Sequence, residues 1–144
     1  MTELLLIIAL AGQRVAIPAE DVEAVVEIEG LTPIPRAADH VAGLAALRSR
    51  VLTVIDCSAS IGLGRSCIDG PREAIVVETD GHPYALLVET VEDVIEFSGK
   101  VRPVRTSLAS GWRRVARGMV EAGEDLLLLV DTQALLAGPA AVAA

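Results

Sequence analysis

An internal repeat constrains the fold of this chain more than any other feature of its sequence. The segment GQRVAIPAEDVEAVVEI, which spans Gly12 to Ile28, matches GHPYALLVETVEDVIEF, which spans Gly81 to Phe97, at an offset of 69 residues. Seven of the seventeen aligned positions are identical, and most of the others exchange one apolar residue for another. The sequence therefore predicts two copies of one structural unit.

A second set of matches extends the repeat toward the carboxyl end of each copy. At an offset of 75 residues, a glycine, a leucine and a strand-ending aspartate recur: Gly43 and Gly118, Leu52 and Leu127, Asp56 and Asp131. A copy of about 70 residues is marginal as an independent fold, so we expect the two copies to bury apolar faces against each other. We predict one domain over 1–144 with two halves, 12–66 and 72–137, whose first and last strands are candidates for exchange between the halves.

Most segments have the pattern of short β-strands. Runs of five to eight residues rich in Val, Ile and Leu are broken by Gly, Pro or Asp, which is typical of strands separated by turns. Short helical turns are expected at 18–21, 58–61 and 132–136, the last with Asp131 as its N-cap, and a loop at 98–113. Strands are expected at 4–10, 14–17, 22–28, 41–47, 50–55, 72–79, 84–88, 92–97, 115–121 and 125–130.

The predicted fold class is all-β, with two pseudo-symmetric five-stranded barrels that share a hydrophobic interface, and with short helices. Open sheet edges are an aggregation hazard in a chain that is 52% hydrophobic, and closure into barrels removes such edges. The apolar excess is expected to fill the core and also to form exposed contact patches, as in proteins that bind other proteins.

The hydrophobic segments are too short for a membrane protein. The mean hydropathy is +0.52, yet no apolar run approaches the roughly 18–20 residues that a membrane span needs. The early run at 4–11 lacks a preceding basic stretch, so it is interpreted as a buried strand and not as a signal peptide. We expect no direct insertion into a membrane.

The charge of the chain argues against nucleic-acid binding. The formal net charge is −8, so the chain as a whole repels phosphate backbones. Five arginines nevertheless cluster in the second half, and we interpret this cluster first as a solvated loop face, then as a docking patch for an acidic partner, and last as a phosphate site. They are Arg102, Arg105, Arg113, Arg114 and Arg117.

Residues with catalytic or metal-binding chemistry are few. Cys57 and Cys67 have neither CxxC nor His-rich spacing, so they are expected to be reduced thiols in a cytosolic protein. His40 and His82 lie far from any cysteine pair, and we predict no metal and no cofactor. The motifs of hydrolases, P-loop enzymes, dinucleotide-binding enzymes and metalloproteases are absent, so we predict no enzyme.

The segment that follows Gly43 resembles the central motif of the CheW-like domain family. That motif is a glycine, a few residues, Asn-Leu-Arg-Gly, and then a strand that ends in Pro-x-x-Asp-Leu. Gly43, Leu47, Arg48 and Asp56 stand at the matching positions. The segments 25–28, with the sequence Val-Val-Glu-Ile, and 84–94 are similar to other segments of the family, so the resemblance covers about 3–137.

The resemblance implies two five-stranded, SH3-like barrels and a scaffold role in bacterial chemotaxis signal transduction. The implied partners are the regulatory domain of a CheA-type histidine kinase and the cytoplasmic tip of a chemoreceptor, and the implied location is the cytoplasm. Val25, Glu27, Gly43 and Arg48 match family positions tied to receptor or kinase binding, and Val91 and Val94 lie on the matching apolar edge of the second half.

Three departures from the motif leave alternatives open. Ala46, Ser49 and Thr53 replace the motif's Asn, Gly and Pro, and Ser tolerates a positive φ less well than Gly, so the hairpin is expected to differ in shape. One alternative is a divergent accessory protein of a non-flagellar pathway, for example one that controls pili. Another is a β-barrel that binds a small apolar ligand, although five-stranded barrels are usually filled by side chains.

Overall fold

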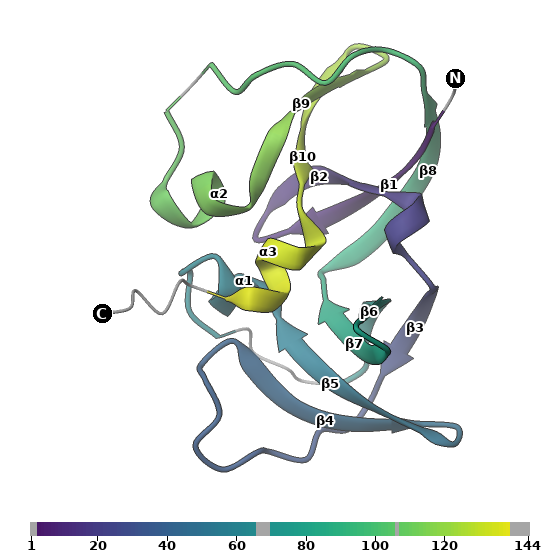
Figure 1. Cartoon of the computed structure of the whole chain (residues 1–144), viewed down its shortest axis with the longest axis vertical. Coiled ribbons are helices and arrows are strands. Elements are labelled where there is room, and N and C mark those ends of the chain that lie inside the picture. The colour runs from purple at the N-terminus through teal and green to yellow at the C-terminus, as the bar shows by residue number, and fades with distance from the viewer. Residues whose placement is uncertain (1–2, 66–69, 106, 139–144) are drawn as a thin grey trace.

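The described part of the chain folds into ten β-strands and a few short helices (Figure 1). The computed structural model describes residues 3–65, 70–105 and 107–138. The strands are β1 (Glu3–Leu10), β2 (Gln13–Pro18), β3 (Ala24–Ile28), β4 (Val41–Leu47), β5 (Arg50–Asp56), β6 (Arg72–Thr79), β7 (His82–Leu87), β8 (Thr90–Phe97), β9 (Ala116–Ala122) and β10 (Asp125–Val130). The helices are the 3-10 turn η1 (Ala19–Asp21), α1 (Cys57–Ser60), α2 (Ser110–Val115) and α3 (Thr132–Ala137).

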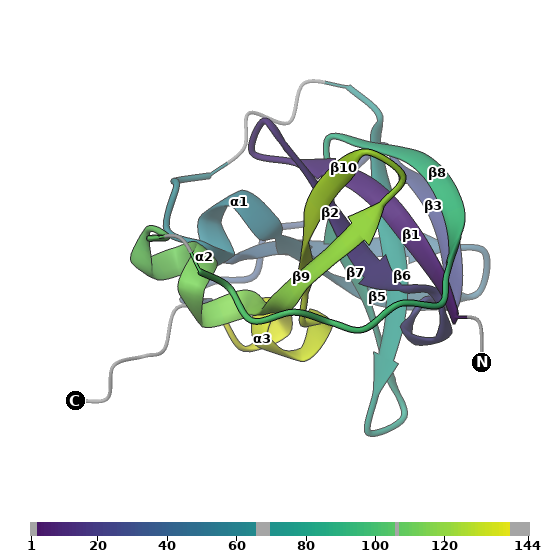
Figure 2. The ribbon, with the colours of Figure 1, turned by 90° about the horizontal axis from the view of Figure 1, so that it is seen from above.

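The strands form two five-stranded sheets with the same internal order. Sheet I has the order β8-β1-β2-β10-β9, and sheet II has the order β3-β6-β7-β5-β4. Each sheet contains one parallel pair, β10 with β2 and β5 with β7, and its other pairs are antiparallel. The first two strands of each sequence repeat pair with the last three strands of the other repeat, so both sheets contain strands from both halves (Figure 2).

The repeat is visible in the backbone as well as in the sequence. Ala11 and Gly12, between β1 and β2, have φ values of 50° and 79°. Asp80 and Gly81, between β6 and β7, have φ values of 53° and 79°. Two successive positive φ angles define a type I′ turn, which favours glycine at its second position. The identical glycines of the repeat are therefore required by identical turns.

Neighbouring residues of one strand serve two different cores. In β1, Leu5 and Ile7 belong to a cluster inside sheet I, whereas Leu6 and Ile8 belong to the central cluster between the sheets. Successive side chains of a strand point to opposite faces, so a strand that is covered on both faces is apolar throughout. This double burial explains the continuous apolar run at 5–10 and contributes to the high hydrophobic content.

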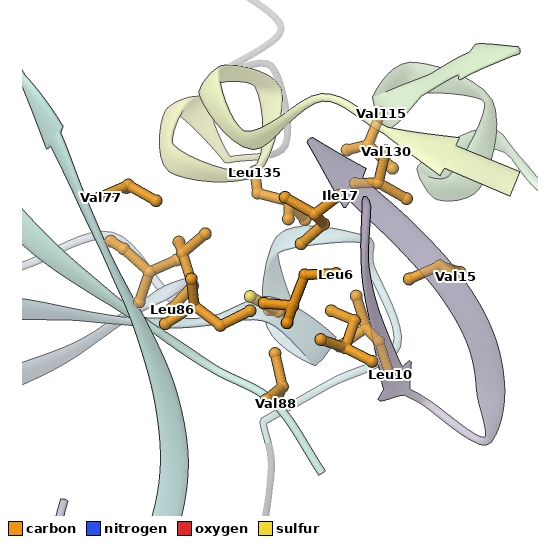
Figure 3. Close-up of a cluster of buried hydrophobic side chains, with 14 of the residues drawn as sticks. Leu6, Leu10, Val15, Ile17, Val77, Leu86, Val88, Val115, Val130 and Leu135 are labelled. Atoms are coloured by element: carbon orange, nitrogen blue, oxygen red, sulfur yellow. The ribbon is translucent and has the colours of Figure 1, made fainter. Parts of the chain in front are cut away.

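The central cluster joins the two sheets (Figure 3). Side chains of β1 and β2 meet side chains of β6 and β7, and Leu135 of α3 packs among them. A second cluster is enclosed by the strands of sheet II. It includes Leu52, Val54, Val76 and Leu87. Burial of each large aliphatic side chain stabilises a fold by about 1.5–3 kcal/mol, so these three clusters hold the two sheets as one body.

The predicted fold class is confirmed: the chain is all-β, with two five-stranded sheets and short helices. The aspartate caps are confirmed too. The Asp56 carboxylate accepts a hydrogen bond from the Ala59 amide at 3.2 Å, and the Asp131 carboxylate accepts one from the Gln133 amide at 2.9 Å. No helix in the described part of the chain is long and apolar enough to span a bilayer.

The prediction of a loop throughout 98–113 was wrong in its last part, where α2 begins at Ser110. Tertiary contacts stabilise this short helix. Trp112 packs against the central cluster, and the Arg114 guanidinium donates hydrogen bonds to the Ser60 carbonyl at 2.7 Å and to the Ala134 carbonyl. Gly111 lies so close to α1 that a Cβ there would collide with the Ile61 carbonyl. Glycine is therefore required at position 111 for space, although glycine is a poor helix former.

Candidate functional site

The outer strands β3 and β8 carry an equivalent pair of exposed valines. Val25 of β3 is 45% exposed and Val94 of β8 is 51% exposed, and the two residues are aligned by the repeat. Each lies opposite a buried residue of the central cluster, Val25 opposite Ile75 and Val94 opposite Leu6. Their equivalent placement on two outer strands makes them candidates for partner contacts. β3 and β8 lie on the same side of the molecule in both overall views (Figures 1 and 2).

Glu27 adds a carboxylate to the exposed face of β3. It lies opposite Glu73 of β6 in the sheet. The Glu73 carboxylate accepts hydrogen bonds from the Thr90 hydroxyl at 3.0 Å and from the Val91 amide at 3.3 Å. No hydrogen bond or ion pair joins the Glu27 carboxylate to another residue of the described ranges. Glu27 is therefore available to a cation or an amide of a partner.

A β-bulge determines where Val91 points. The register between β1 and β8 shifts between Ile7 and Ile8, so that Val91 lies opposite Ile8 while Val94 lies opposite Leu6. In a regular strand, residues three apart would point to opposite faces, and the extra residue of a bulge restores a common face. Val91 is half-buried against the central cluster, so it supports the strand while Val94 is exposed.

Gly43 has a structural position in the site. It is buried in β4 with a φ of 151°, and a Cβ there would lie 2.6 Å from the Thr32 carbonyl oxygen. Gly118 in β9 is equivalent, with a φ of 158° and a distance of 2.7 Å from its would-be Cβ to the Arg102 carbonyl oxygen. Both glycines let the loop that follows an outer strand pack on the last hairpin. Gly43 therefore shapes the sheet and is not itself exposed to a partner.

Arg48 is exposed at the tip of the β4–β5 hairpin. Its φ is 59°, and the aligned residue of the β9–β10 hairpin is Gly123, with a φ of 63°. Ser49 is not among the residues with positive φ, so the substitution in the motif does not fall on the strained position. A non-glycine residue in this left-handed region costs about 1–2 kcal/mol. Among described residues no carboxylate pairs with Arg48, so its planar guanidinium is free to bind one bidentately.

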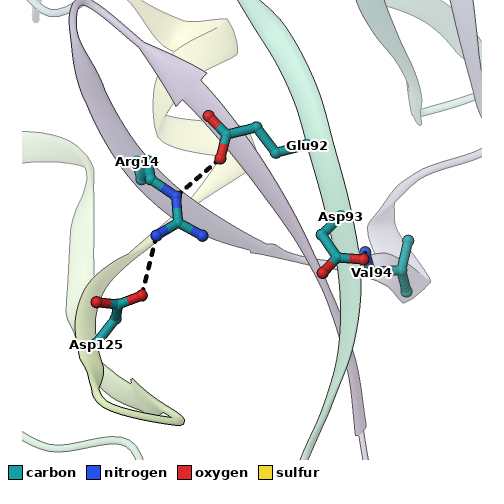
Figure 4. A network of polar contacts seen from close by, with 5 residues as sticks. All are labelled: Arg14, Glu92, Asp93, Val94 and Asp125. Carbon is teal, nitrogen blue, oxygen red and sulfur yellow. Dashed lines mark hydrogen bonds and ion pairs between the residues drawn. The ribbon is translucent and has the colours of Figure 1, made fainter.

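Two arginine clamps, which the sequence analysis missed, hold the start of each outer strand. In sheet II, Arg50 contacts Glu23 at 2.6 Å and Glu78 at 3.8 Å. In sheet I, Arg14 contacts Glu92 at 2.8 Å and Asp125 at 3.0 Å (Figure 4). The hydrogen bond to Glu23 raises the pKa of Arg50, and those to Asp125 and Glu92 raise the pKa of Arg14. Glu23 and Glu92 are identical positions of the repeat, which was the available signal.

The six predicted residues thus fall into two groups. Val25, Glu27, Gly43 and Arg48 belong to sheet II, and the Arg50–Glu23 contact joins the hairpin of Arg48 to the start of β3. Val91 and Val94 belong to sheet I. The exposed members are Val25, Glu27, Arg48 and Val94, whereas Gly43 and Val91 support them from within.

The described residues do not form a reactive centre. Cys57 is buried, and burial together with the nearby Asp56 carboxylate raises the pKa of its thiol, so the thiol stays protonated. Cys67 lies outside the described residues. No three His, Cys, Asp or Glu side chains of the described part converge as metal ligands. The apolar clusters occupy the interior of each sheet, which gives the predicted small-ligand alternative no support.

Comparison with known proteins identifies the family. Residues 4–140 match the family model described as CheW-like domain. The chain is 30% identical to "Chemotaxis protein CheW" of Rhizobium meliloti over 77% of its own length and 74% of that protein, and 22% identical to "Chemotaxis protein CheW" of Thermotoga maritima over 86% and 81%.

A solved structure shows the same fold. The crystal structure of the scaffolding protein TtCheW from Thermoanaerobacter tengcongensis superimposes with a TM-score of 0.78 and 22% identity, covering 91% of this chain and 90% of the other. The two-sheet architecture agrees with this match. This chain belongs to the CheW-like domain family.

Proposed function

We propose that this chain is a non-enzymatic cytoplasmic adaptor that couples chemoreceptors to a CheA-type histidine kinase. Membership of the CheW-like family supports a scaffold role in chemotaxis, and the relatives are named as chemotaxis and scaffolding proteins. The proposed partners are the regulatory domain of the kinase and the cytoplasmic tip of the receptor. Binding, not chemistry, is the proposed activity.

The observation that carries the proposal is the pair of equivalent outer strands with exposed valines. An adaptor must bind two partners at once, and two copies of one contact surface on a rigid body provide this. Val25 on β3 and Val94 on β8 occupy equivalent positions, and both strands are backed by the central cluster. Apolar residues at the centre of an interface provide affinity, and surrounding charges provide orientation and specificity. Glu27 supplies such a charge on the strand of Val25, and Arg48 supplies one on the hairpin that the Arg50–Glu23 contact joins to the start of β3.

The proposal is tested by pull-down with the kinase regulatory domain and with a receptor cytoplasmic fragment, each with thermal melts of the variant. Arg48→Ala is expected to weaken binding to at least one partner while changing the free energy of unfolding by less than about 0.5 kcal/mol, as at other exposed sites. Unchanged binding to both partners would remove Arg48 from the site.

A matched pair of valines provides a control for the outer strand. Val25→Glu introduces a charge at a residue that is 45% exposed, and Val101→Glu introduces the same charge at a residue that is 46% exposed in the loop after β8. Val25→Glu is expected to reduce binding at least tenfold, because a buried unpaired charge in an interface costs more than about 1.4 kcal/mol. Equal effects of the two substitutions would contradict a specific role for β3.

The altered motif favours one variant of this proposal, a divergent accessory adaptor of a non-flagellar pathway. Ala46, Ser49 and Thr53 lie on the same hairpin as Arg48, which would therefore meet a partner of different shape. Binding assays with the kinases of a flagellar and of a pilus pathway from the native cell discriminate the two. Preference for the flagellar kinase would reject the accessory role.

A further inference from the structure

The positive charge of this acidic chain is concentrated in one segment. The net charge is −8, yet 98–120 contains six of the chain's 12 Lys and Arg residues and no Asp or Glu. The corresponding loop of the first half, 29–40, contains one arginine, Arg36, and two acids, Glu29 and Asp39. This concentration of positive charge is therefore found in the second half alone and is not a property of the repeat.

Three arginines of the segment lack a carboxylate partner in the described part of the chain. Arg102 pairs with Glu121 at 2.8 Å, and Arg114 is turned into the protein toward α1 and α3. In contrast, Arg105, Arg113 and Arg117 are exposed, and no ion pair joins them to a described residue. The Arg113 guanidinium donates a hydrogen bond to the Leu108 carbonyl at 3.1 Å, which holds it over the loop.

An apolar groove lies beside these arginines. A hollow of about 330 Å³ runs between the loop and sheet I, and its apolar lining includes Leu108, Trp112, Met119, Leu126 and Leu128. Leu126 is 55% exposed, so this lining is open to solvent. A second hollow of about 500 Å³ shares Leu108 and is lined by Arg105 and Arg113. The two hollows are adjacent, because Ser107 and Leu108 line both, and the arginines of the larger hollow lie beside the apolar residues of the smaller one.

We propose that this surface binds an acidic peptide segment of a partner protein that also carries a large apolar side chain. The apolar side chain would occupy the groove over Trp112, and the carboxylates would face Arg105 and Arg113. Paired guanidinium–carboxylate contacts beside a desolvated apolar anchor are the combination that gives peptide interfaces both affinity and orientation. None of the six residues of the candidate adaptor site lines either hollow, so this is a separate surface.

Nucleic acid fits the surface less well than a peptide does. Single-stranded nucleic acid requires a continuous basic groove with several stacking side chains. Here the aromatic lining is Trp112 alone, the other lining residues are aliphatic apart from Gln13, Arg14 and Ser107, and Arg14 is already paired with Glu92 and Asp125. The large negative charge of the whole chain opposes a long polyanion more strongly than a short acidic peptide.

The chain carries its own probe for this binding, because Trp112 is its only tryptophan. A synthetic dodecapeptide with six Asp or Glu residues and two Leu residues is titrated into the full chain at low salt, and the emission of Trp112 is recorded. A saturable change in intensity or wavelength is expected, and it should weaken at least tenfold between about 0.02 and 0.2 M salt because the attraction is screened. The same peptide with Gln and Asn in place of its acids is expected to give no saturation.

Two double variants with the same charge change test the location. Arg105→Gln with Arg113→Gln is expected to weaken binding of the acidic peptide at least tenfold. Arg36→Gln with Arg65→Gln removes two exposed arginines elsewhere and is expected to weaken it less than twofold. Equal weakening by the two pairs would overturn the proposal, as would the absence of saturation up to millimolar peptide. A stronger saturable response to a single-stranded oligonucleotide would overturn the assignment to a peptide.

Discussion

Sheets I and II have the same strand order but differ at the tips of their last hairpins. The β9–β10 hairpin of sheet I has Gly123 at its positive φ, where glycine is unstrained, and the β4–β5 hairpin of sheet II has Arg48 there. The residue that begins the following strand is Asp125 in sheet I and Arg50 in sheet II. Backbone strain persists at surfaces that need a particular side chain. The comparison therefore agrees with the proposal that Arg48 of sheet II contacts a partner, whereas the tip of the sheet I hairpin carries glycine.

In the loops that precede these hairpins, the distinctive feature belongs to sheet I and not to sheet II. In sheet II the loop 29–40 carries mixed charge, whereas in sheet I the loop 98–109 carries only cations and continues into α2. Each sheet thus has one elaborated segment, the hairpin in sheet II and the preceding loop in sheet I. The two sheets share one strand order, and the proposed acidic-peptide surface uses the loop of sheet I, whereas the proposed adaptor site includes the hairpin of sheet II and an outer strand of each sheet.

The largest expected effect tests whether the two sheets are equivalent at their buried glycines. Gly43→Ala and Gly118→Ala each place a Cβ within 2.6 or 2.7 Å of a backbone carbonyl oxygen. Each is expected to lower the free energy of unfolding by about 3 kcal/mol, because backbone atoms cannot move aside as side chains do. Chemical denaturation measures the change.

Gly30→Ala is the control for the glycine pair, since a Cβ at Gly30 meets no atom within 4 Å and its φ is not positive. It is expected to be nearly neutral. If one of Gly43→Ala and Gly118→Ala were neutral as well, the two sheets would not share the close approach described above.

An intermediate effect is expected at the hairpin tips. Arg48→Gly removes a left-handed cost of about 1–2 kcal/mol and adds about 0.5–1 kcal/mol of unfolded-state entropy, so the variant should be more stable by roughly 0.5–1 kcal/mol. Gly123→Arg should be less stable by a similar amount. Thermal melts distinguish these directions. Loss of stability on Arg48→Gly would mean that the Arg48 side chain stabilises the fold and is not held there for a partner.

The smallest effect is expected at the arginine clamps. Arg14 has two carboxylates within 3.0 Å, whereas Arg50 has one at 2.6 Å and a second only at 3.8 Å. Arg14→Gln should therefore lower the melting temperature slightly more than Arg50→Gln, and both losses should disappear near about 1 M salt, where exposed pairs are screened. Arg36→Gln serves as the unpaired control. A loss that persists at high salt would indicate packing and not charge.

Local features of the fold were predictable from the sequence, and long-range ones were not. The strands and the Asp131 N-cap depend on a few neighbouring residues, and all were found. Helix α2 was missed because its stability comes from Trp112 and Arg114, whose contacts lie far away in the sequence. Gly111 also argued against a helix, since glycine has low helix propensity. In the structure this glycine is needed because α2 packs closely against α1 there.

The candidate site was predictable to a similar degree. The repeat and the central motif located Val25, Val94 and Arg48, which the structure places on exposed surface. They did not reveal that Val91 is turned inward by a bulge, because a shift of register depends on the partner strand. The clamps of Arg14 and Arg50 were missed for the same reason, since each joins strands that are distant in the sequence.

The mixed composition of the sheets has a consequence for how the molecule comes apart. The hairpin β1–β2 is paired with β8 and β10, and the hairpin β6–β7 is paired with β3 and β5, so neither half of the chain can detach while a sheet remains intact. Melting is therefore expected to be a single cooperative transition in which both proposed binding surfaces disappear together. A destabilised variant would then be lost as a whole, with no folded half left over.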